Sequence, residues 1–192
     1  MRKTPSRVFG AWKRRWMAPV VGWLLAAAIF PTPARAAEPG QAQDNARQAV
    51  GLFLKSCVEF SGDRDGLRAW AKKAGVPELS EPVANAFLYG LPGAVYDATS
   101  KGIKLVLVSE ENGSCSTIAQ LADGPTVLRE LERILRDSRV KLNITGDKPD
   151  PKEAKLQHRE YTANGAKREW QMLVSTVNDP AGGEAMLTAN PW

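Results

Sequence analysis

The chain has little of the chemistry that most enzymes need. It contains two cysteines and one histidine in 192 residues, which is too few for a zinc site built from several such ligands. It has no phosphate-binding P-loop, no G-x-G-x-x-G motif and no G-x-S-x-G nucleophile turn. These absences predict no metal and no cofactor, and they leave no recognisable catalytic set.

Long apolar runs are also scarce. The run near the start, Met17–Phe30, has 14 residues, whereas a membrane-spanning helix needs roughly 20. Six basic residues and no acid precede it, and small residues follow it, with Ala34, Ala36 and Ala37 around the expected cut. This pattern predicts a cleavable secretory signal peptide over residues 1–36. We therefore expect no stable membrane insertion of the mature chain.

Two other fates for this segment stay open. An uncleaved membrane anchor is the first, and twin-arginine export through Arg14 and Arg15 is the second. We favour the general secretory route because paired arginines are common in basic leader segments. No cysteine stands near the cleavage point, which argues against a lipid-anchored protein. The expected location is the periplasm or the exterior of the cell.

The mature chain has little excess charge of either sign. The whole sequence holds 26 basic and 21 acidic residues, but seven of the basic ones lie within residues 1–36. From Ala37 onward the balance is 19 basic to 21 acidic residues, a net charge of −2. We therefore expect no nucleic-acid binding, which needs a concentrated basic surface. About 156 residues remain, enough for a single domain over 37–192.

Helical periodicity dominates the first half. A first helix begins near Gln41, with apolar side chains at spacings of three and four. A second follows a cap at Ser61 or Asp63 and ends at Gly75, before a proline. A short helical turn is expected near residues 83–88, and another full helix follows Asp123. The stripe of the first helix consists of Ala46, Val50, Phe53, Cys57 and Phe60.

The remaining segments read as antiparallel strands. "IKLVLVSE" is aliphatic enough for a central strand, and Asn112-Gly113 after it favours a two-residue hairpin turn. That turn sets Glu110 opposite Cys115 and places Cys115 on the face of Val106 and Val108. After a polar loop over "GDKPDPKEA", Asn164-Gly165 and "PAGG" divide a C-terminal meander. We predict an α+β fold with about three helices on one face of the sheet.

The two cysteines pose a choice between a structural bridge and a reactive thiol. Exported proteins meet oxidising conditions, and two cysteines allow only one internal bridge. Cys57 faces the core from the first helix, and Cys115 lies on one face of the hairpin. Neither cysteine belongs to a C-x-x-C motif, and Cys57 lies late in its helix, away from the N-terminus that would lower a thiol pKa. We predict a Cys57–Cys115 disulfide.

Other polar groups have ordinary structural explanations. His158, in a strand of alternating polarity, is expected to be a surface or half-buried residue rather than a ligand or general base. A Ser-His-Asp set can always be assembled from one histidine and some serine, so composition alone does not support it. The acids at 63–65 and 146–150 fit capping and turns, and neither group has calcium-loop spacing.

Four short segments suggest a relationship. "AVGLFLKSC", "NGSC", "MLVST" and "AMLTANP" resemble small exported two-cysteine proteins of bacteria, specifically proteobacteria, whose function is uncharacterised. In those proteins one cysteine lies late in the first helix and another follows a strand turn. Some of them carry a lipid-attachment cysteine, which this chain lacks. The resemblance implies export and the bridge, and it implies no activity.

These observations favour a non-enzymatic function. We expect a soluble exported domain that binds an unknown protein partner, as an accessory component of a cell-envelope assembly. Exposed sheet edges are one place where a partner strand could add. Two alternatives stay open: a small envelope hydrolase with a pocket that the sequence does not reveal, and a sensor of small ligands that uses the curved sheet.

Overall fold

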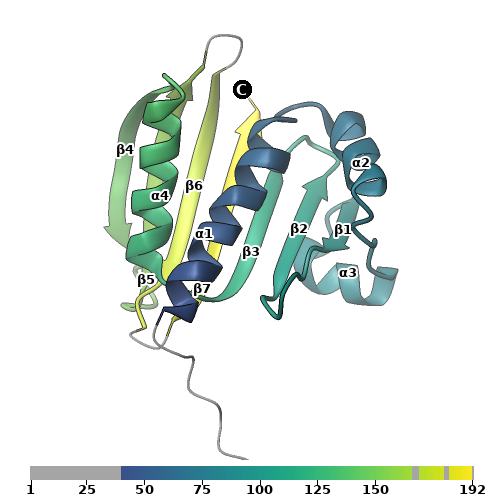
Figure 1. Ribbon diagram of the computed structural model, residues 1–192, viewed down its shortest axis with the longest axis horizontal. Helices are drawn as coiled ribbons and strands as arrows, with labels where there is room; N and C mark the ends of the chain where they lie inside the picture. The colour runs from purple at the N-terminus through teal and green to yellow at the C-terminus, as the bar shows by residue number, and fades with distance from the viewer. Residues whose placement is uncertain (1–39, 166–168, 180–181, 192) are drawn as a thin grey trace, which may run out of the picture. The chain divides into compact units, whose positions relative to one another are not determined.

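A seven-stranded antiparallel sheet forms the centre of the protein. The computed structural model describes residues 40–165, 169–179 and 182–191. The strands lie in the order β1-β2-β3-β7-β6-β5-β4 (Figure 1). The C-terminal strand β7 thus pairs with both β3 and β6 and joins the first hairpin to the meander. The strand bounds are β1 Gly93–Asp97, β2 Leu105–Glu110, β3 Cys115–Ala122, β4 Lys141–Pro149, β5 Leu156–Asn164, β6 Glu169–Val177 and β7 Gly183–Pro191.

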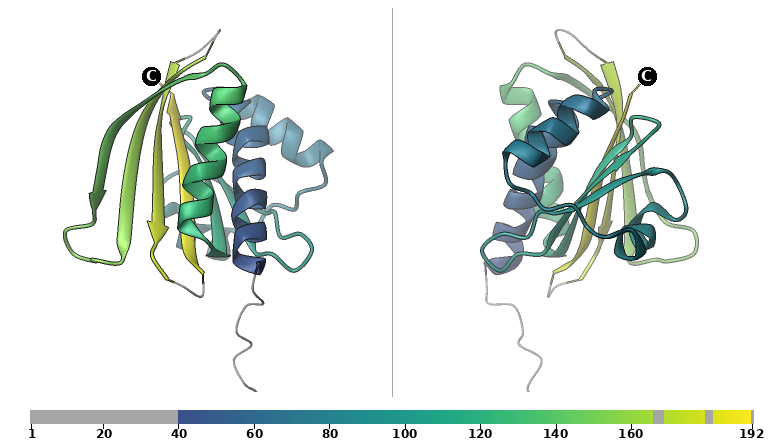
Figure 2. Two further views of the ribbon diagram at one scale, coloured as in Figure 1. Left: turned by 60° about the vertical axis from the view of Figure 1, so that its left-hand side comes forward. Right: turned by 90° about the vertical axis from the view of Figure 1, so that its right-hand side faces the viewer.

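Helices lie on both faces of this sheet. α1 and α4 cover one face side by side, and α2 lies on the same side near β1 and β2 (Figures 1 and 2). α3 packs on the opposite face, where Ala84 and Leu88 meet Val95 and Val108. The α+β class is confirmed, but the prediction of about three helices on one face is wrong. The described residues form four α-helices: α1 Gln41–Phe53, α2 Arg64–Lys73, α3 Glu81–Leu88 and α4 Gly124–Asp137.

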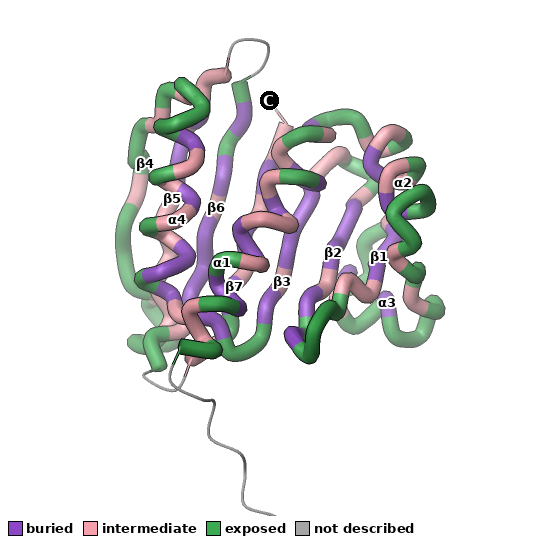
Figure 3. Tube along the Cα trace, viewed as in Figure 1, coloured by how far each residue is buried: buried purple, intermediate pink, exposed green. Residues whose placement is uncertain are grey.

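The predicted stripe of the first helix is confirmed at four of its five positions, where it faces the sheet and is buried: Ala46, Val50, Phe53 and Cys57. The fifth, Phe60, lies in the turn after the helical segment and is half-buried. After Phe53 the helix widens into a π-helical turn, η1 (Leu54–Val58), which ends the regular α1 just before Cys57. Figure 3 shows buried positions along the central strands and on the sheet-facing sides of α1 and α4.

Two helices begin at the caps that the sequence indicates. The Asp63 side chain accepts a hydrogen bond from Gly66 N at 3.0 Å at the start of α2. Asp123 accepts one from Thr126 N at 2.8 Å at the start of α4. Each cap satisfies an amide that the helix leaves unpaired, which stabilises the helix by about 1 kcal/mol. Beyond α2, Gly75 adopts the expected left-handed conformation, with φ +70°.

The first hairpin differs from its prediction by one residue. Glu110 N donates to Ser114 O at 2.9 Å, so three residues form the loop instead of two. Gly113 is left-handed with φ +91°, as three-residue hairpin loops require. Cys115 therefore pairs with Ser109, and the predicted pairing with Glu110 is wrong. Cys115 shares its face with Leu105 and Leu107, the residues between those predicted.

The first four of the nine residues predicted as a polar loop, 146–149, belong to β4, and the other five lie in the loop before β5. β4 continues through a bulge between Ile144 and Gly146 and ends at Pro149. The extra residue of the bulge keeps the strand paired with β5 although the sequence looks like a loop. In β6 alternate residues share one side of the strand and are buried: Trp170, Met172, Val174 and Thr176.

The predicted disulfide is present. Cys57 in η1 and Cys115 at the start of β3 are bonded, with their Cα atoms 5.1 Å apart. Both residues are buried, so the bridge lies inside the core between the helical layer and the sheet. It fastens the end of the first helical segment to a central strand.

Replacing both cysteines by alanine is expected to lower the free energy of unfolding by about 4 kcal/mol. The reason is that the bridge closes a segment with a sequence separation of 58, which restricts the unfolded chain. Urea denaturation of the double variant and of the oxidised protein measures the difference. The reduced wild-type protein should unfold like the variant. A loss below about 1 kcal/mol would show that the bridge adds little to the fold.

Candidate functional site

The sequence-predicted site residues fall into three groups. Cys57 and Cys115 are joined and buried, and their role here is structural. The expected cleavage residues Ala34, Ala36 and Ala37 lie outside the described residues, so the signal peptide stays a prediction. His158 is half-buried, as expected, but it takes part in a specific set of hydrogen bonds that the sequence did not indicate.

His158 bridges a serine and an aspartate on the sheet face opposite α1. It is the cross-strand neighbour of Ser175, and its Nδ1 lies 2.8 Å from Ser175 Oγ. Its Nε2 lies 3.1 Å from Asp150 Oδ2. The other oxygen of Asp150 accepts hydrogen bonds from the backbone amides of Lys152 and Glu153. The Ser175–His158–Asp150 chain therefore holds the start of the β4–β5 loop on the sheet.

This chain has the polarity of a general-base relay. A carboxylate only accepts hydrogen bonds, so Nε2–H of His158 donates to Asp150. In the neutral imidazole Nδ1 then accepts the hydroxyl proton of Ser175, which is how a serine nucleophile is activated. Ser175, however, is only 6% exposed and lies in mid-strand between β5 and β7. Its amide belongs to the sheet ladder and does not form an oxyanion hole.

A second surface is the end of α3, where apolar side chains project into solvent. We call it the α3 tip and define it by Tyr89 and Leu91, which follow the last residue of the helix and are 89% and 51% exposed. The turn that follows the helix is hydrogen-bonded, because Tyr89 N donates to Asn85 O and Leu91 N to Leu88 O. The tip is thus an ordered apolar protrusion.

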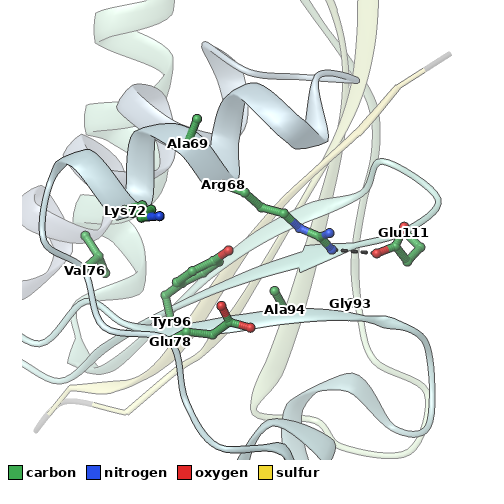
Figure 4. Close-up of a pocket in the computed structure, with 9 residues that line it drawn as sticks. All are labelled: Arg68, Ala69, Lys72, Val76, Glu78, Gly93, Ala94, Tyr96 and Glu111. Atoms are coloured by element: carbon green, nitrogen blue, oxygen red, sulfur yellow. Dashed lines mark hydrogen bonds and ion pairs between the residues drawn. The ribbon is translucent and has the colours of Figure 1, made fainter.

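A third feature is a cavity of about 510 Å³ between α2 and β1. We call it the α2–β1 pocket (Figure 4). The helix supplies residues from one side, while β1 and the segment before it supply the other. Charged side chains, one tyrosine and small apolar groups share the lining, which consists of Arg68, Ala69, Lys72, Val76, Glu78, Gly93, Ala94, Tyr96 and Glu111.

One corner of the pocket is a cluster of two arginines and one acid. Arg68 Nη2 donates to Glu111 Oε1 at 2.7 Å, and Arg64 Nη1 donates to the other oxygen. The guanidinium of Arg68, with Arg64 beside it, holds the pKa of Glu111 below its ordinary value. A second acid, Asp65, lies 3.1 Å from Arg64 Nε, so the ion pairs of this corner leave no net charge. Arg68 Nε is buried and has no hydrogen-bond partner among the described residues.

Tyr96 lies at the centre of the pocket. It is 4% exposed, and Figure 4 shows its hydroxyl directed toward Arg68. Burial and then the charge of Glu78 raise the pKa of Tyr96, although Arg68 lowers it, so the hydroxyl keeps its proton at neutral pH. No hydrogen bond to this hydroxyl is found within the described part of the chain.

Sequence reasoning missed this pocket because its residues come from separate segments. Tyr96 lies in a strand, Arg68 in a helix and Glu111 in a turn, so no short segment of the sequence contains them together. Glu78 and Tyr96 form an isolated antiparallel β-bridge, and no local sequence pattern predicts a pairing between residues so far apart. Within the described ranges, no helix is both long and apolar enough to cross a bilayer, and no three metal-ligating side chains are grouped.

The replacement His158→Leu is expected to raise the pKa of Asp150. The backbone amide of Lys152 and then His158 hold this pKa below its ordinary value. Without His158 the pKa of Asp150 rises, but the hydrogen bond from the Lys152 amide keeps it below the ordinary value. In the native protein the attachment of the loop holds at neutral pH and is lost as pH falls through the lowered pKa. An NMR titration of the Asp150 carboxyl carbon measures the shift.

The matched control for this titration is Thr162→Val, a change on the same face of β5 that leaves the Ser175–His158–Asp150 chain intact. It should leave the pKa of Asp150 unchanged. A pKa that does not rise in the His158 variant would mean that the histidine contributes nothing to the carboxylate.

Comparison with known proteins adds no assignment to these three surfaces. No protein family, no curated protein and no solved structure matches the chain.

Proposed function

We propose that this chain is an exported, non-enzymatic domain that binds a protein partner in the bacterial cell envelope, as an accessory component of an assembly. Export is supported by the leader pattern of residues 1–36, and the buried disulfide suits an oxidising compartment. The proposed contact surface is the α3 tip. Exposed aromatic and aliphatic side chains on an ordered turn are the usual anchors of protein interfaces.

The observation that carries this proposal is the backbone of Tyr89. It adopts the left-handed conformation, with φ 49°, at the end of α3. In this conformation a residue with a side chain is about 1 kcal/mol less stable than glycine, the residue that most often ends helices this way. Tyr89 is 89% exposed, so packing of its ring does not offset this strain. A strained position that holds an exposed aromatic suggests a role outside the fold.

The sheet edges are less suitable for a partner than the sequence suggested. β1 is covered along its outer side, because Leu79 N donates to Val95 O and Asp97 N donates to Pro77 O. β4 is the other edge, and it carries Lys148, Pro149 and a bulge. These are the features by which proteins prevent strands from adding to an edge. The α3 tip has no such protection.

The replacement Tyr89→Gly is expected to raise stability by about 1 kcal/mol and to weaken partner binding at least tenfold. The stability gain comes from relief of the left-handed strain, and the binding loss comes from removal of an anchor side chain. Urea denaturation measures the first effect. The second is measured on the partner obtained by site-specific photo-crosslinking from position 89 in the bacterium, followed by titration of the two purified proteins.

Lys101→Gly is the matched control, because Lys101 is also exposed and left-handed, with φ 50°. It should give a similar gain in stability and leave partner binding unchanged. A crosslinker placed at Asn143 on β4 tests the edge-strand alternative. Crosslinking from position 143 but not from position 89 would refute the α3 tip as the contact surface.

A second candidate function, ester hydrolysis, is favoured by one observation. The Ser175–His158–Asp150 chain places a hydroxyl, an imidazole and a carboxylate in hydrogen-bonding order on the face that α1 and α4 leave open. In such a reaction Ser175 Oγ would form the acyl bond while His158 takes the hydroxyl proton and passes it to the leaving alcohol. The buried position of Ser175 ranks this function second.

Hydrolysis predicts that the purified protein cleaves an activated ester such as p-nitrophenyl acetate and that Ser175→Ala lowers kcat by about a thousandfold or more. Ser116→Ala is the control, because Ser116 lies on the same face of the sheet. Its hydroxyl is hydrogen-bonded to Thr188 Oγ1 at 2.9 Å and not to a histidine. Equal rates in both variants would exclude the serine as a nucleophile.

A further inference from the structure

We propose that the α2–β1 pocket binds a small zwitterion, a molecule of amino-acid or dipeptide size that carries one carboxylate and one ammonium group. These features support the assignment: Lys72 and Glu78, which form no ion pair among the described residues, the unpartnered buried Nε of Arg68, the Tyr96 hydroxyl directed into the pocket, and a cavity of suitable volume. This inference concerns a surface separate from the α3 tip and does not depend on the proposed protein partner.

The carboxylate of the ligand belongs between Arg68 and Lys72. Arg68 pairs with Glu111, and its buried Nε has no hydrogen-bond partner among the described residues. Lys72 also lines the pocket and forms no ion pair with the residues that the structure describes. An anion placed between Arg68 and Lys72 meets two cations and gains charge-assisted hydrogen bonds.

Tyr96 supplies the directional contact. Its side chain is more than nine-tenths buried, and its hydroxyl points into the pocket with no partner in the described ranges. The hydroxyl oxygen itself is accessible from the pocket, so a ligand oxygen can replace the solvent beside it. Because the hydroxyl keeps its proton, it can donate to a carboxylate next to Arg68.

The ammonium of the ligand belongs at Glu78. Figure 4 shows the Glu78 carboxylate directed into the pocket on the side of Tyr96 away from Lys72 and Arg68. It forms no ion pair among the described residues. Its charge disfavours a dianion such as phosphate in this cavity, while the arginines and Lys72 disfavour a simple cation. A ligand with both charges satisfies both sides.

The volume and the apolar lining of the pocket limit the size and the side chain of the ligand. A volume of about 510 Å³ lies within the range of small-molecule sites, roughly 300–1,000 Å³. Ala69, Val76 and Ala94 provide a modest apolar wall between the charged groups. This wall suits a short aliphatic side chain and favours leucine or a leucine dipeptide as probes.

Titration of the disulfide-bonded protein with leucine and with dileucine tests the assignment. We expect saturable binding of at least one of them, with shifts of the Ala94 and Tyr96 amides in NMR spectra. N-acetylleucine, which lacks the ammonium, and leucinamide, which lacks the carboxylate, should each bind at least tenfold more weakly. Leucine bound more tightly than dileucine indicates a free amino acid, and the reverse indicates a peptide.

Two variants locate the ligand. Tyr96→Phe keeps the buried ring and should weaken zwitterion binding about tenfold by removing one hydrogen bond. Glu78→Gln should weaken leucine binding while leaving N-acetylleucine unaffected or improved. Glu81→Gln, an acid on α3 outside the pocket, is the control and should change nothing. Absence of saturable binding, or equal binding of leucine and N-acetylleucine, would overturn the assignment.

Discussion

The contact between α1 and the β3–β7 pair is the constraint on which the rest of the structure depends. β7 is the last strand in sequence and lies between β3 and β6, so it closes the sheet only if one element holds both halves together. α1 does this over a surface of small side chains, because Ala119, Ala185 and Ala189 of the strands are almost fully buried. Ala46 and Ala49 of the helix are equally buried, and together these residues allow a close approach. A larger side chain at any of these positions would separate the layers, since tightly packed interiors tolerate added volume poorly.

The disulfide secures one end of this contact. Cys115 is the register partner of Ala189, so the bridge attaches η1 to the point where β3 and β7 pair. In the other half of the sheet, a network of polar side chains attaches α4 to the strands. Arg159 donates to Asp147 and to Glu132, and the Tyr161 hydroxyl donates to Glu132 at 2.9 Å. These bonds connect α4 with β5 and β4. Both helices are therefore fixed to the sheet, and the α3 tip and the pocket lie at its β1 end, outside these attachments.

The sequence predicted features whose causes are local and failed where the cause is distant. Periodicity located α1 and α4, and Asp63 and Asp123 marked helix starts because capping involves residues three positions apart. The register of the first hairpin was wrong because the Asn112 side chain accepts Ser114 N at 2.8 Å and extends the loop by one residue. The position of α3 on the opposite face was missed because an apolar stripe shows which side of a helix is buried and not which face of the sheet it meets. The disulfide was predictable because only one pair of cysteines exists.

The candidate sites depend on β1, a strand whose two faces serve different surfaces. Val95 points toward α3 and packs with Ala84 and Leu88, whereas Tyr96 points into the α2–β1 pocket. Residues 77–79 bind the outer side of the same strand, which places Glu78 beside Tyr96. At Gly93 a Cβ atom would lie 2.6 Å from the backbone oxygen of Ser109, so glycine is what allows the start of β1 to lie this close to β2. Because strand residues alternate between the two faces, one short strand sets both the base of the α3 tip and the floor of the pocket. No single segment of the sequence reveals either surface, since each is completed by side chains that only the assembled sheet brings together.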